Sequence, residues 1–145
     1  MGERHRSDRN VGGRPDDRVA PGSCQPYGPP GRPGGRTWEA QVANSSALAD
    51  HRQAIWRCED LRLNAAPTEE IAEARAAARI TRSAITGPMT TLSLLAPELT
   101  EPARAAAKAT YLLRDAPDRA TLDTLLQAAR DANGRLVAAA RTYLT

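Results

Sequence analysis

The stretch ITGPMTTLSLLAPELTEPA, residues 85–103, decides how many helices this chain has, because prolines interrupt an otherwise helix-like sequence there. Pro88 has no amide hydrogen, and its ring clashes with the carbonyl group of Ala84. It also disfavours helical angles at Gly87. A helix that reaches this point therefore either ends at Thr86, or kinks and resumes with Pro88 in its first turn. We predict a helix hinge at Gly87 and Pro88.

The residues after this hinge also have a helical pattern. Apolar side chains recur at intervals of three and four residues, which is typical of a helix with one buried face; they are Met89, Leu92, Leu95 and Leu99. Pro97 and Pro102 mark the next junction. The stretch has no ionisable group before Glu98, so we expect packing there and no catalysis.

Helical periodicity extends on both sides. The first helix is predicted over residues 37–64 with Thr37 as its cap, or alternatively from Ser46, because Asn44, Ser45 and Ser46 weaken its first half. The other expected caps are Thr68, Thr100 and Asp118. The expected core faces are Leu48, Ile55 and Cys58 with Trp56 and Leu63 in the first helix; Ile71, Ala74, Ala78 and Ile85 in the second; and Leu122, Leu125, Leu126, Ala129, Leu136, Ala140, Tyr143 and Leu144 in the last.

The fold class follows from these segments. No segment alternates with a period of two, so no strand is required. The connections at 65–67 and 116–117 are short, which makes consecutive helices antiparallel neighbours. We predict an all-α fold, an antiparallel up-down bundle of three or four helices. Many expected interface positions are Ala, which bury little area, so we expect a protein partner or self-association through the Ala/Leu helix faces.

The composition divides the chain into two parts. Residues 1–36 hold eight of the ten Gly and six of the eleven Pro, and carry seven Arg against four acidic residues. We interpret this segment as a disordered tail, and residues 37–145 as the helical bundle, whose charges balance. An alternative is that the tail is not translated, because Val11 or Val19 can be encoded by an alternative bacterial start codon.

The sequence contains no convincing set of catalytic, cofactor-binding or metal-binding residues. His51 and Cys58, seven residues apart, are the one local pair worth testing as ligands, and two ligands do not make a zinc site. We expect a half-buried cysteine and a surface histidine there. No phosphate-binding glycine loop is present after residue 36. We therefore expect a non-enzyme without cofactor or metal. Without a signal peptide or apolar span, it should be a cytoplasmic protein with reduced thiols.

Nucleic-acid binding is the second functional hypothesis. The basic tail could neutralise phosphates, and Arg75, Arg79 and Arg82 would line one outer face of the second helix. These are the candidate nucleic-acid contacts. We expect Glu69, Glu70 and Glu73, which precede them on the same helix, to neutralise them through pairs three or four residues apart.

The helix that runs into a Gly-Pro step and is followed by a second amphipathic helix resembles a known group of proteins. Ile80, Ile85, Gly87, Pro88 and the Ala and Leu positions after them carry the likeness, within residues 38–145. The chain is similar to small Ala- and Arg-rich helical accessory proteins of actinobacterial conjugative plasmids and integrative elements, including the plasmid spread (Spd) proteins. The resemblance implies a role in plasmid transfer and intramycelial spread. It implies no site residues.

Overall fold

The computed structural model describes residues 34–145, so the predicted disorder of the tail falls almost entirely outside the described residues. The described chain consists of four α-helices and one short 3-10 turn, with no strand between residues 34 and 145. The all-α fold with four helices is therefore confirmed. The elements are α1 (Gly35–Leu63), α2 (Thr68–Leu95), the 3-10 turn η1 (Pro97–Leu99), α3 (Thr100–Tyr111) and α4 (Arg119–Leu144).

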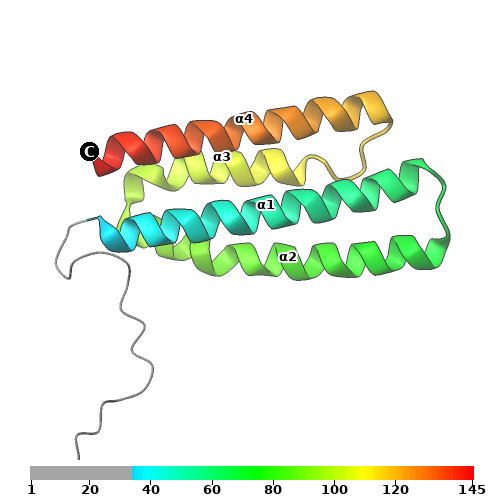
Figure 1. Ribbon diagram of the computed structural model, residues 1–145, viewed down its shortest axis with the longest axis horizontal. Helices are drawn as coiled ribbons and strands as arrows, with labels where there is room; N and C mark the ends of the chain where they lie inside the picture. The colour runs from blue at the N-terminus through cyan, green and yellow to red at the C-terminus, as the bar shows by residue number, and fades with distance from the viewer. Residues whose placement is uncertain (1–33) are drawn as a thin grey trace, which may run out of the picture.

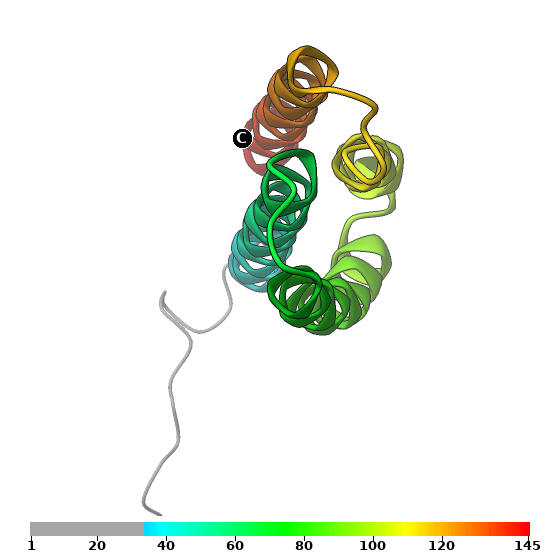
Figure 2. The same ribbon diagram turned by 90° about the vertical axis from the view of Figure 1, so that its right-hand side faces the viewer.

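Consecutive helices run in opposite directions, as the short connections predict (Figure 1). Viewed along the bundle, α1 lies between α2 and α4 and also contacts α3 (Figure 2). The four helices differ in length: α1 has 29 residues, α2 has 28 and α4 has 26, whereas α3 has only 12. The side of the bundle that α3 occupies is therefore covered by helix over less than half of the length of α2.

The first helix is continuous through the polar residues that were expected to weaken it. It begins at Gly35, so Thr37 is a buried helical residue and not a cap, and a restart at Ser46 is wrong. Asn44 is fully buried in the bundle, and the Ser45 hydroxyl donates to Asn133 of α4 at 3.4 Å. Packing against α4 overrides the weak helix propensity of this segment.

The second helix is also continuous, with Pro88 in its interior. The alternative in which the helix ends at Thr86 is wrong. Buried Ile85 and Leu92 lie on either side of the proline, and their packing holds the helix together across it. The chain turns instead at Ala96 (φ −142°, ψ 78°), directly before η1. A hinge at Gly87 and Pro88 within the continuous helix stays a prediction.

The core follows most of the predicted apolar faces. In the second helix, Ala74 and Ile85 are buried, while Ile71 and Ala78 are half-buried. In the last helix, the stripe is confirmed except at Tyr143, which is 40% exposed. The fully buried large side chains of the bundle include Leu48, Leu92, Leu99, Leu113, Leu122 and Leu136.

One of the predicted helix caps is confirmed. The Asp118 carboxylate accepts a hydrogen bond of 2.7 Å from the Thr121 backbone amide. This bond holds the pKa of the Asp118 carboxyl below its ordinary value. Thr68 and Thr100 are not caps: each is the first residue of its helix, and neither helix has a side-chain cap. For α3 the reason is that Leu99 already has helical angles as the end of η1.

No helix within residues 34–145 is both long enough and apolar enough to cross a membrane.

Replacing Pro88 with alanine tests the cost of the interior proline. Pro88→Ala restores an amide that can donate to the Ala84 carbonyl, so we expect the free energy of unfolding to rise by about 1–3 kcal/mol. Urea unfolding measures the change. Pro102→Ala is the matched control, because Pro102 lies in the first turn of α3, where a proline removes no hydrogen bond. If Pro88→Ala lowers stability by several kcal/mol, the proline is a fixed corner on which the packing depends.

A candidate anion-binding cleft between α1, α2 and α3

Three arginines form a row on one side of α2. Arg75, Arg79 and Arg82 are four and three residues apart, so they share a helix face, and all three are exposed as predicted. The predicted pairing with Glu69, Glu70 and Glu73 is wrong. The separations between these acidic residues and the arginines are two, five, six or more residues, so no pair shares a face. No ion pair joins the two groups in the described part of the chain.

The glutamates lie on the other side of α2. Glu70 and Glu73 line a small groove of about 300 Å³ between α1 and α2, together with Asp50 and Arg57 of α1. The two flanks of α2 therefore carry opposite charges. The basic flank is not neutralised by its own helix.

The arginine row forms one wall of a cleft of about 450 Å³, which we call the arginine cleft. Helix α1 forms a second wall, and the end of α3 with the following loop forms the third. Its lining residues are His51, Ile55, Cys58 and Glu59 from α1; Arg75, Ala78, Arg79 and Arg82 from α2; and Tyr111, Arg114 and Asp115. Four guanidinium groups against two carboxylates give this cleft a basic character.

An aromatic ring lies inside the cleft and contacts one of the arginines. The guanidinium carbon of Arg82 lies 3.7 Å from the centroid of the Tyr111 ring, a cation–π contact. The His51 ring meets the same tyrosine edge-on, with 5.7 Å between the ring centroids. Arg82, Tyr111 and His51 thus form a connected group from three different helical segments.

The His51 ring is tied to α2 through Thr81. The Thr81 hydroxyl lies 2.8 Å from His51 Nδ1 and 3.0 Å from the Ala78 carbonyl oxygen, to which it can donate. When it does so, its contact with Nδ1 requires a proton on Nδ1, and Nε2 is then the unprotonated nitrogen of a neutral ring. The Nε2 atom is buried and has no partner within residues 34–145.

His51 is buried, with 3% of its surface exposed, so the expectation of a surface histidine is wrong. Burial lowers its pKa from 6.5 to about 4, and the positive charge of Arg82 acts in the same direction. Cys58 is also buried. Burial and the nearby Glu59 charge raise the pKa of its thiol, while Arg75 partly opposes them. Neither side chain is set up for proton transfer or nucleophilic attack near neutral pH.

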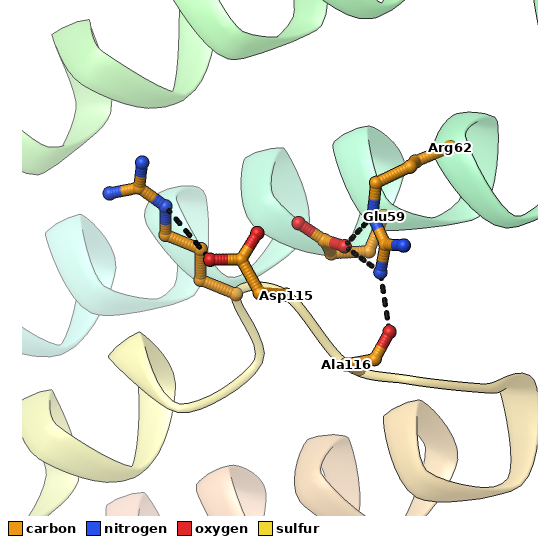
Figure 3. A network of polar contacts seen from close by, with 5 residues as sticks. Glu59, Arg62, Asp115 and Ala116 are labelled. Carbon is orange, nitrogen blue, oxygen red and sulfur yellow. Dashed lines mark hydrogen bonds and ion pairs between the residues drawn. The ribbon is translucent and has the colours of Figure 1, made fainter.

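An ion pair between the half-buried Arg62 and the buried Glu59 carboxylate fixes the third wall of the cleft. The Glu59 side chain is 5% exposed, and its carboxylate accepts from Arg62 Nε at 2.7 Å and lies 2.6 Å from Arg62 Nη2. The same Arg62 donates to the Ala116 backbone carbonyl, across from α1 to the loop before α4 (Figure 3). Asp115, next in the loop, has a left-handed φ of 62° and faces Arg114 at 3.8 Å. These contacts of Arg62 with Glu59 and Ala116, which we call the clamp, fix the loop whose residues Arg114 and Asp115 line the cleft.

Metal binding has no support within residues 34–145, because no three His, Cys, Asp or Glu side chains converge there. The candidate pair His51 and Cys58 does line one cleft, but guanidinium groups surround it. The chemistry that the cleft supports is binding of an anion, since arginine forks match phosphate and carboxylate oxygens.

The sequence located the arginine wall of this site, and it singled out His51 and Cys58 of the α1 wall only as a pair of possible metal ligands. The three arginines are evident from helical spacing alone. Tyr111 and Arg114 are about 30 residues further along, and His51 about 30 residues earlier, with no local signal that links them to the arginine row. Only the antiparallel packing of the helices brings them together.

The depressed pKa of His51 predicts a measurable dependence of stability on pH. The unfolded chain binds a proton near pH 6.5, whereas the folded chain resists it until about pH 4. The neutral His51 therefore contributes to the free energy of unfolding above pH 6.5, and this contribution is lost as the pH falls. It amounts to roughly 2 kcal/mol between pH 7 and pH 5. Urea unfolding at both pH values should show a smaller loss for His51→Gln than for the unchanged protein. Equal losses would show that His51 does not titrate in this way.

Comparison with known proteins confirms the resemblance to plasmid transfer proteins of actinobacteria. Residues 39–144 match the family described as KilB plasmid transfer protein. A relative from Streptomyces lividans, Protein KilB, is 52% identical over 102 residues, which cover 70% of this chain and 69% of the relative. No solved structure matches. This chain belongs to the KilB family of plasmid transfer proteins.

Proposed function

We propose that this chain is a non-enzymatic accessory protein that promotes plasmid transfer and intramycelial spread by helix-to-helix contact, with a protein partner or with a second copy of itself. The observation that carries the proposal is an exposed, uncharged face on α2. Ile80 is 73% exposed and Leu94 is 77% exposed, both on the side of α2 that points away from the core. The two side chains lie 14 residues apart, about 21 Å along the helix axis, and therefore mark the two ends of one outward face of α2.

The surroundings of these two residues support the same interpretation. From Ser83 to Pro97 the chain has no charged residue. Gly87 lies on the outer face between Ile80 and Leu94, and an added Cβ there would meet nothing within 4 Å. A partner helix could therefore approach α2 closely without displacing any charge.

The family gives the biological setting of this surface. The relative in Streptomyces lividans carries the name Protein KilB, and the matching family is one of plasmid transfer proteins. A cytoplasmic location and an action on transfer without catalysis are parts of the proposal. Support for the second comes from the cleft, where burial lowers the pKa of His51, which makes it a weaker base, and raises the pKa of the Cys58 thiol, which keeps it protonated near neutral pH.

A nucleic-acid-associated role is the second candidate. The observation that favours it is the arginine cleft, where Arg75, Arg79 and Arg82 have no carboxylate partners among the described residues. The basic tail, to which the sequence first assigned this role, lies almost wholly outside the described residues.

Charge placed on the outer face of α2 tests the accessory role. We expect the double variant Ile80→Glu, Leu94→Glu to lower plasmid transfer and spread at least tenfold in matings with a plasmid that lacks its own copy of this gene. The reason is that a partner would have to bury two carboxylates without counter-charges. Light scattering after size-exclusion chromatography, on both proteins, shows whether a second copy is the partner.

The matched control places the same charges on another helix. Ala128 and Ala138 are exposed on α4, so Ala128→Glu, Ala138→Glu adds two carboxylates to a different surface. It should leave transfer within about twofold, and circular dichroism should show that both variants keep their helices. Normal transfer by the α2 variant would contradict the proposal.

A further inference from the structure

We propose that the arginine cleft is a binding site for a single strand of nucleic acid, with the arginines on the phosphates and Tyr111 under a base. This inference goes beyond the accessory role and does not depend on it. It gives the second candidate function a site inside the helical bundle. The argument rests on the charge, shape and hydrogen-bonding capacity of the cleft.

The spacing of the arginines suits a chain of phosphates. At 1.5 Å of rise per residue, Arg79 and Arg82 lie about 6 Å and about 10 Å along the axis from Arg75. The row is therefore a linear array of three fork-shaped donors. No described carboxylate forms an ion pair with any of the three. Their charge is available to an external anion.

The inner surface of the cleft suits a planar, apolar group. Ile55 and Ala78 line it beside the half-buried Tyr111 ring. Proteins that bind single strands combine a basic groove with aromatic rings on which bases stack. A volume of about 450 Å³ accommodates a nucleotide unit, whereas a duplex is far too wide to enter. The shape therefore selects a single strand.

The contact of Arg82 with Tyr111 indicates how a strand would bind. Its guanidinium covers the Tyr111 ring at 3.7 Å, in the place that a base would take. A phosphate in front of the row attracts Arg82 outward, which uncovers the ring. The His51 ring, whose buried Nε2 has no partner among the described residues, meets the same tyrosine edge-on. An N–H group on the edge of a stacked base, such as the N3–H of thymine, is a donor that could satisfy Nε2.

An acidic peptide fits the cleft less well. Its carboxylates would pair with the arginines, but it offers no planar group for the tyrosine. Glu59 and Asp115 on the opposite walls also confine an anion to the arginine side. A strand with its phosphates on the arginines and a neutral base toward Tyr111 places each group against its complement.

Fluorescence anisotropy of the full-length chain with a labelled 20-nucleotide oligodeoxythymidine tests the proposal. The triple variant Arg75→Gln, Arg79→Gln, Arg82→Gln should bind at least tenfold more weakly at 0.1 M salt. The slope of log affinity against log salt should also fall by about 2, because three phosphate contacts on a single strand each account for about 0.7. The control variant Arg104→Gln, Arg135→Gln, Arg141→Gln removes three exposed arginines outside the cleft.

The control is expected to bind within about threefold of the unchanged protein, since it loses net charge and the exposed ion pair of Arg104 with Glu101 but no residue of the cleft. Equal loss in both triple variants would overturn the proposal, because the charge of the whole chain would then account for binding. Competition by poly-glutamate at lower concentration than by unlabelled oligonucleotide would also overturn it, in favour of an acidic protein partner.

The role of the ring has its own pair of variants. Tyr111→Phe keeps a stacking surface and should bind the oligonucleotide as the unchanged chain does, whereas Tyr111→Leu should bind at least threefold more weakly. Equal binding by both would contradict the stacking part of the proposal. The Ile80→Glu, Leu94→Glu variant should bind the oligonucleotide as the unchanged chain does. Failure of this site and failure of the accessory role can therefore be told apart.

Discussion

The shape of this bundle depends on the contacts that the Arg62 guanidinium group makes with the Glu59 carboxylate and with the Ala116 carbonyl. A carboxylate that is 5% exposed must be compensated, and Arg62 compensates it with two nitrogens. The same guanidinium group also donates a hydrogen bond to the Ala116 carbonyl, which fixes the loop before α4 to the end of α1. A second pair, Asp60 with Arg119, joins α1 to the first residue of α4.

The loop that this attachment fixes follows an α3 of only 12 residues, beside an α2 of 28. A full-length α3 would cover the first half of α2 and bury its arginines. Because the chain leaves the helix after Tyr111, that flank of α2 stays open and becomes the arginine cleft. The outer face of α2 is uncharged from residue 83 onward. One helix of a plasmid transfer protein thus presents two surfaces of different chemistry.

The helical fold could be predicted from the sequence because its signals are local. The regular leucine stripe of α4 and the Asp118 cap depend on neighbouring residues only, and both are confirmed. Local signals failed where tertiary packing outweighs them. Asn44 continues a helix because it is enclosed by the bundle, and Pro88 is tolerated between two buried side chains.

The candidate site could be predicted only in part, for the same reason. The arginine row is a local pattern, and its outward position was correct. The expectation that the glutamates of α2 neutralise these arginines was wrong, because the glutamates lie on the opposite flank of the helix. The contribution of Tyr111 and His51 depends on contacts between helices far apart in the sequence, which periodicity does not report.

Chemical modification of the arginines with phenylglyoxal, followed by mass spectrometry, tests whether Arg62 is held in the clamp while the arginines of the cleft are accessible. Arg75 and Arg79 should react as fast as Arg135, an exposed residue outside the cleft. Arg62, whose guanidinium is held by a carboxylate and a carbonyl, should react much more slowly. If Arg62 reacts as fast as Arg135, its contacts with Glu59 and Ala116 do not persist in solution, and if Arg75 and Arg79 are protected, the arginine row is not open to an external anion.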